Sequence, residues 1–174
     1  VLMWNVDEGL NQIDKYFHNS EDYVKAGACL AMGILSAGVR NESDPALALL
    51  TDYLDNPSKN IRRAAICGLG IAYAGARREE ISDLLMPLAA YAGENSDIIE
   101  SSLAALALGM VFVGTANDEI GSVLVQRLME SSEDDLNNTI SRYLCLGLGL
   151  VYLGKSENAD VILEAVRTVV SIAA

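Results

Sequence analysis

Four strongly apolar stretches alternate along the chain with segments in which apolar and polar residues are mixed. The apolar stretches cover residues 26–38, 64–75, 103–114 and 143–154. Even the longest, extended to residue 116, is too short to span a bilayer and suits a buried helix. The mixed segments place apolar residues at helical spacing and charges on the opposite side. The pattern therefore predicts two kinds of helix, one buried and one amphipathic.

The mixed segments cover residues 7–17, 45–54, 79–91, 118–129 and 159–172. Several have N-terminal capping residues, such as Asn117 and the Asp44-Pro45 pair, and we also expect Ser20 and Asn60 to cap the apolar helices that follow them. No stretch alternates with period two, so we predict no strand. The expected fold is all-α, with nine helices in an inner apolar layer and an outer amphipathic layer.

The apolar stretches are copies of one another. Aligned on a central glycine, they place Gly33, Gly70, Gly109 and Gly149 in one column, at spacings of 37, 39 and 40 residues. A second column, five residues later, holds Gly38, Gly75, Gly114 and Gly154. A fixed period of this size indicates about four helical-hairpin repeats in a solenoid or ring.

The glycine columns predict two structural features. A glycine inside a helix costs about 1 kcal/mol relative to alanine, so its repeated use at the central position indicates that another backbone comes close there. The second column fits the end of each helix, where glycine adopts the left-handed cap at low cost. We expect both features in all four repeats.

Composition narrows the range of functions. The chain has 174 residues, 24 acidic and 12 basic side chains, a net charge of −12 and 51% apolar residues. This acidity argues against nucleic acid as a partner, and the apolar content argues against disorder. The three cysteines lack the spacing of a disulfide framework, which favours a reducing compartment. The start at Val1-Leu2-Met3 suggests a piece of a longer protein, and we treat residues 1–174 as a single repeat domain.

Few residues support catalysis. Gly149 to Ser156 matches a phosphate-loop pattern, but its four intervening residues are large and apolar, and a preceding strand is not expected. The repeat explains its glycines, and Lys155 is interpreted as a surface charge. Cys29, Cys67 and Cys145 lie in apolar stretches, and the single histidine, His18, lies at a helix end. We therefore expect no enzymatic activity, no metal and no cofactor.

The acidic residues are concentrated in one region. Residues 94–135 contain nine acids and one base, Arg127, a local net charge of −8. On the segment 118–129 and the residue after it, one polar face opposite the apolar one contains Glu119, Ser122, Val123, Gln126 and Glu130. This stripe suits a partner with a hydrophobic patch and a basic rim, since charge steers the encounter and Val123 adds apolar contact. The alternative is a solvated face that keeps the chain soluble.

The repeated motif, seen in residues 108–117 and 148–154, resembles the proteasome/cyclosome repeat family. Within that family, the stretch 111–120 is similar to the large non-ATPase scaffold subunits of the 26S proteasome base. The resemblance implies an arc of a larger toroid, in the cytoplasm and nucleus. It also implies binding of ubiquitin, ubiquitin chains and the ubiquitin-like domains of shuttle factors, and contact with other regulatory-particle subunits. Neither nucleic acid nor membrane is an expected partner.

The resemblance also implies a site. Three acidic family positions map onto Glu119, Gln126 and Glu130, so glutamine replaces one acid here. Adjacent outer helices, containing Glu79, Glu80 and Asp83 or Asp160 and Glu164, are expected to extend the surface. A purely structural role in subunit assembly, without ubiquitin binding, is the alternative.

Overall fold

The computed structural model describes residues 5–39, 44–90 and 97–172. These residues form ten α-helices and one short 3-10 helix, and none of them lies in a strand. The chain divides into two compact units, residues 1–74 and 75–174. The all-α, helical-repeat fold class is confirmed. The single domain and the closure of a toroid stay predictions.

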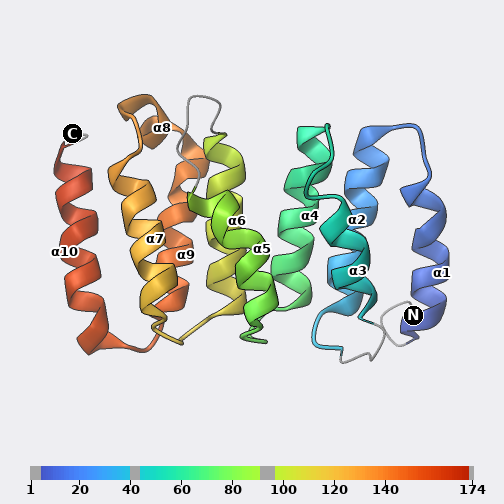
Figure 1. Ribbon diagram of the computed structural model, residues 1–174, viewed down its shortest axis with the longest axis horizontal. Coiled ribbons are helices and arrows are strands. Elements are labelled where there is room, and N and C mark those ends of the chain that lie inside the picture. Colours follow the sequence, from blue (N-terminus) through green and yellow to red (C-terminus); the bar gives the residue numbers. More distant parts are fainter. Residues whose placement is uncertain (1–4, 40–43, 91–96, 173–174) are drawn as a thin grey trace. The chain divides into compact units, whose positions relative to one another are not determined.

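The first unit contains four helices in two layers (Figure 1). The inner helices are α2 (Asp22–Ser36) and α4 (Lys59–Ala72), and they pack against each other along their length. On the outside, α1 (Val6–Phe17) covers α2, and α3 (Pro45–Asp52) covers α4. The core forms where these layers meet; its fully buried side chains include Met32, Leu50, Ile61, Ile66 and Leu69.

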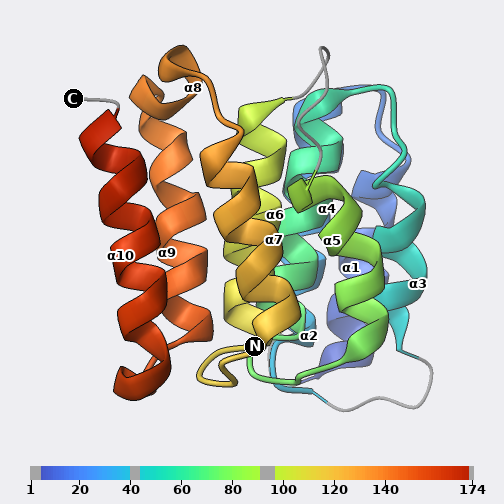
Figure 2. The same ribbon diagram turned by 60° about the vertical axis from the view of Figure 1, so that its left-hand side comes forward.

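The second unit repeats this arrangement (Figure 2). Its inner helices are α6 (Ile98–Val111) and α9 (Arg142–Val151), and its outer helices are α5 (Glu79–Ala90), α7 (Asp118–Met129) and α10 (Ser156–Ile172). The nine predicted helices are thus all present. The short helix α8 (Glu133–Asn137) and the 3-10 helix η1 (Thr139–Ser141) lie between α7 and α9 and were not predicted. Three acids in the first turn of α8 and the cap by Ser132 explain this additional turn of helix.

The inner helices meet backbone to backbone at glycine. A Cβ atom added to Gly33 on α2 would lie 2.5 Å from the carbonyl oxygen of Gly68 on α4. In the second unit, a Cβ atom on Gly109 would lie 2.5 Å from the carbonyl oxygen of Gly147 on α9. Any side chain at these positions would push the helices apart, because packed interiors lack room for added atoms. The predicted close approach is confirmed at Gly33 and Gly109.

The same prediction is wrong for Gly149, because a Cβ atom there would have no neighbour within 4 Å. Each close contact pairs a central glycine with a glycine two residues before the centre of the next copy, Gly68 or Gly147. Among the described residues no further inner helix follows α9, so none of them meets Gly149. The second glycine column behaves as predicted, with φ between 65° and 74° at all four positions.

Capping was predicted with mixed success. The side chain of Asn117 accepts a hydrogen bond from the backbone N–H of Ile120 at 3.1 Å, as expected. Ser20 and Asn60 are not the N-caps of the helices that follow them: α2 is preceded by Glu21 and α4 by Ser58, neither with a side-chain capping bond. Asp44 precedes Pro45 in the left-handed region, φ 40°, and Tyr73 donates a hydrogen bond to its carboxylate instead.

Candidate functional site

The predicted acidic stripe lies on the outer side of α7. Glu119, Ser122, Gln126 and Glu130 are exposed, and Val123 is half-buried between them. On the opposite side of the helix, Ile120, Leu124 and Leu128 are buried in the core. The Gln126 amide donates a hydrogen bond of 2.8 Å to the Glu130 carboxylate, so these two side chains form a unit. The structure thus brings all five predicted residues to one accessible face.

Arg127, the one base of this region, does not lie on the exposed face. Its side chain is only 2% exposed and lies on the inner side of α7. There its guanidinium donates a 2.9 Å hydrogen bond to the Ser131 hydroxyl, which in turn donates to the carbonyl oxygen of Arg127. The one base of the acidic region therefore acts inside the unit, at the C-terminal end of α7. The sequence did not reveal this, because position 127 falls between the apolar and polar faces.

A repeated set of backbone hydrogen bonds fixes the start of both neighbouring outer helices. Before α7, the N–H groups of Gly114 and Ala116 donate to Leu150 and Val151 at the end of α9, both at 2.9 Å. Before α5, the N–H groups of Gly75 and Arg77 donate in the same way to residues 110 and 111 at the end of α6, at 2.9 and 3.1 Å. Each pair donates to two carbonyls at the C-terminal end of an inner helix, where few intrahelical donors remain.

These bonds also set the positions of two acids. Glu79 follows Arg77 by two residues, and Glu119 follows Ala116 by three. The two glutamates stand in the first turns of α5 and α7, where the helix dipole favours negative charge. The backbone positions of both glutamates are therefore set by contacts with the inner helices.

A groove of about 610 Å³ lies between α5 and α7. Acidic side chains from both helices line it: Glu79 and Asp83 from α5, and Glu119 from α7. Apolar groups lie between them, among them Val123 and Phe112. The remaining lining residues are Ser82, Met86, Pro87, Ala90 and Asn117. This groove joins the α7 face to the α5 acids, which sequence reasoning had placed only as neighbours.

On its other side, α7 contacts α10. Asp160 and Glu164 on α10 are exposed, as predicted for an extension of the surface. Arg167 lies 3.8 Å from Glu164 and partly offsets its charge. The α5 side is therefore the more acidic continuation. Glu80 on that side is bound by Arg78, which leaves Glu79 and Asp83 as the acids that line the groove.

Comparison with known proteins shows what the chain is similar to. The model of the proteasome/cyclosome repeat matches residues 27–63. The 26S proteasome regulatory subunit rpn-1 of Neurospora crassa is 45% identical over 172 residues, and rpn1 of Schizosaccharomyces pombe is 44% identical over 169. The 26S proteasome non-ATPase regulatory subunit 2 of Dictyostelium discoideum is 37% identical over 169. Each match covers 97% of this chain. The chain thus contains a match to the proteasome/cyclosome repeat and is similar over nearly its whole length to these regulatory subunits.

The chain spans about a fifth of the length of these relatives, 19% in each of the three. The four apolar stretches are the inner helices, and the spacing of the glycines follows from the packing of one copy against the next. Helix packing therefore accounts for these glycines without any ligand.

The phosphate-loop pattern has the structural explanation expected for it. Gly149 lies inside helix α9, which ends at Val151, and Gly154 occupies the left-handed turn that follows. A phosphate loop needs a strand before it, whereas here a helix precedes the turn. Lys155 is exposed, as predicted for a surface charge. The pattern arises from the repeat.

The three cysteines and the single histidine were the other candidates for chemistry. Burial raises the pKa of all three cysteine thiols, that of Cys29 to about 11, which disfavours the reactive thiolate. His18 is exposed at the end of α1, 3.9 Å from Asp14. Among the described residues, no group of acids, histidines and cysteines is placed to hold a metal ion. Within the same ranges, every helix is too short or too polar to cross a membrane.

Proposed function

We propose that this chain is a non-catalytic part of a proteasome regulatory subunit that binds ubiquitin, ubiquitin chains and the ubiquitin-like domains of shuttle factors. The binding surface is the outer face of α7 with Glu119, Ser122, Val123, Gln126 and Glu130, continued across the groove to α5. The observation that supports this most is the exposure of the stripe, next to a groove that combines carboxylates with apolar side chains.

The chemistry of the surface fits the hydrophobic patch and basic rim of the ubiquitin fold. Val123 and the apolar groups in the groove would contact the patch, and carboxylates on α5 and α7 would face the basic rim. Long-range attraction from a net charge of −12 would speed the encounter more than it would tighten the complex. We expect a small interface, below about 1,200 Å², with avidity supplied by linked ubiquitins.

A second candidate function is a purely structural one. The relatives are named as regulatory subunits of the 26S proteasome. The chain could therefore act as a scaffold that holds other regulatory-particle subunits and binds no ubiquitin. The two proposals differ in one measurable property, the affinity of the isolated chain for ubiquitin.

Reversing the charge at two positions tests the receptor proposal. The double substitution Glu119→Lys/Glu130→Lys should weaken binding of ubiquitin about tenfold or more, because two carboxylates that face the basic rim become cations. The matched control is Glu133→Lys/Asp134→Lys, which makes the same charge change on exposed residues of α8. Calorimetric titration with ubiquitin gives both affinities, and circular dichroism confirms that the helices persist.

Three results are informative. Weaker binding by the α7 variant alone supports the proposed face. Equal weakening by both variants would mean that overall charge, and not this face, governs the affinity. No binding by the unmodified chain at millimolar ubiquitin would rule out the receptor and leave the scaffold.

A further inference from the structure

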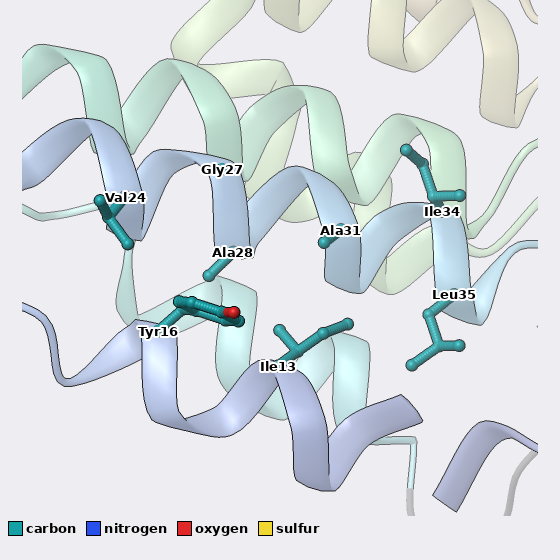
Figure 3. A pocket seen from close by; sticks show the side chains of 8 residues that line it. All are labelled: Ile13, Tyr16, Val24, Gly27, Ala28, Ala31, Ile34 and Leu35. Atoms are coloured by element: carbon teal, nitrogen blue, oxygen red, sulfur yellow. The ribbon is translucent and has the colours of Figure 1, made fainter. Parts of the chain in front are cut away.

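Two grooves of the molecule differ in charge. The groove between α1 and α2, of about 470 Å³, is lined by described residues that are all uncharged, among them Ile13, Tyr16 and Ile34 (Figure 3). The groove between α5 and α7 is also partly apolar, but three carboxylates line it, and none of its described lining residues is basic. A cation would therefore prefer the groove between α5 and α7.

The three carboxylates of this groove, from Glu79, Asp83 and Glu119, are exposed. Within the ranges that the structure describes, none of them forms an ion pair, whereas the neighbouring Glu80 is bound by Arg78. A groove lined by charges of one sign concentrates the electric field and attracts ions of the opposite sign. The groove is therefore complementary to a positively charged group.

Pro87, inside α5, adds a backbone acceptor on the same side. Proline has no N–H group, so the carbonyl oxygen of Asp83, four residues earlier, lacks its usual donor within the helix. This oxygen lies between two residues that both line the groove. A ligand with several N–H donors suits this side of the groove, because a backbone carbonyl and carboxylates are available together.

Apolar side chains lie between the carboxylates of the two helices. Phe112, which is only 5% exposed, and Val123 line the groove together with Met86 of α5. Such a surface suits the aliphatic stem of a long basic side chain, and an aromatic ring attracts a flat organic cation. An inorganic cation would gain nothing from these contacts.

We infer that the groove between α5 and α7 binds an arginine side chain of the protein partner, an inference that rests on the proposed function for the identity of that partner. The stem lies on Val123, and the guanidinium lies between Asp83 and Glu119. Arginine fits better than lysine, because its rigid plane of five N–H donors serves acceptors on two helices and stacks on Phe112. The groove thus selects a partner by the position of one arginine.

Two small ligands test the groove without any protein partner. Nα-acetyl-arginine amide has the proposed side chain, and Nα-acetyl-citrulline amide is its uncharged isostere. In NMR titrations of the isotope-labelled chain, the arginine ligand should shift backbone amides of α5, of Phe112 and of residues 117–123, with a dissociation constant on the order of 10 mM. The citrulline ligand should shift them about a third as far or less. Amides of the uncharged groove between α1 and α2 should not shift.

Three results of these titrations would overturn the inference. The absence of any shift in the groove would mean that it does not take the side chain. Equal shifts from both ligands would mean that charge plays no part in the binding. Shifts of the same size around the three acids in the first turn of α8 would mean that the arginine ligand follows acidic charge in general.

A neutral substitution in the groove provides the second test. Asp83→Asn keeps the size of the side chain and should weaken binding of the arginine ligand and of ubiquitin, each about threefold or more. The matched control Asp134→Asn makes the same change on an exposed residue of α8 and should leave both affinities unchanged.

The ubiquitin titrations separate this inference from the proposed function. If ubiquitin binds the Asp83→Asn variant as tightly as the unmodified chain, the inference is wrong and the proposed function stands. If the unmodified chain takes the arginine ligand but not ubiquitin, the proposed function is wrong and the groove remains an arginine site for another partner.

Discussion

The contact between α6 and α9 and the outer face of α7 lie within the same unit, yet their residues are constrained in opposite ways. At the inner contact, Gly109 and Gly147 leave no room for a single added carbon atom. On the outer face, Glu119, Gln126 and Glu130 are exposed, and each can change without displacing a neighbour. The inner contact and the proposed binding face therefore lie on different helices, so substitutions can affect stability without affecting binding, or the reverse.

The largest loss of stability is expected where the inner helices α6 and α9 meet. Gly147→Ala should lower the free energy of unfolding by about 2–3 kcal/mol, because its Cβ atom would lie 2.6 Å from the carbonyl carbon of Ala105. Gly149→Ala is the matched control two residues further on; its Cβ atom meets nothing, so helix propensity should stabilise the chain by up to about 1 kcal/mol. Urea denaturation followed by circular dichroism compares the two, and equal losses would contradict the backbone contact.

A smaller loss of stability is expected where the outer helix α7 meets the residue that follows the inner helix α9. A Cβ atom on Gly121 of α7 would collide with the hydroxyl end of Tyr152, just after α9. Gly121→Ala should therefore destabilise by about 1–2 kcal/mol, since a tyrosine tip can shift further than a backbone can. Adding Tyr152→Phe should restore part of that loss in a double-mutant cycle. Strictly additive losses would mean that the two residues do not touch.

The smallest effect is expected on the outer face. Gln126→Asp adds a carboxylate and removes the hydrogen bond from Gln126 to Glu130, so affinity for ubiquitin should rise about twofold while stability changes by less than about 0.5 kcal/mol. Gln126→Ala is the control, since it removes the bond and adds no charge. Calorimetric titration measures both, and weaker binding by the aspartate variant would count against electrostatic steering at this position.

Repetition explains how much of the fold could be predicted. Because one pattern occurs four times, the inner helices and their glycine columns could be recognised from the sequence. All nine expected helices are present. The five-residue helix α8 was missed because it is too short to show a helical period. The caps expected at Ser20 and Asn60 were wrong because local hydrogen bonding decides which residue ends the loop: Asn19 and Asn56 instead accept bonds from the backbone of Glu21 and Ser58.

The candidate site was predictable only in part. The exposed face of α7 follows from helical periodicity, so Glu119, Ser122, Gln126 and Glu130 could be placed from the sequence. The groove could not, because it depends on how far apart α5 and α7 lie, and that distance is set by backbone bonds from Gly75 and Gly114 to the inner helices. The burial of Arg127 was equally hidden, since a lone base among acids is normally solvated.

We propose that the outer face of α7 is a surface for the ubiquitin fold. Titration of the isotope-labelled chain with unlabelled ubiquitin, followed by NMR of its backbone amides, tests this directly. The account predicts shifts concentrated in residues 118–130 and on the α5 side of the groove, with the inner helices unaffected. No shift at millimolar ubiquitin, or shifts confined to residues outside α5, α7 and α10, would contradict it.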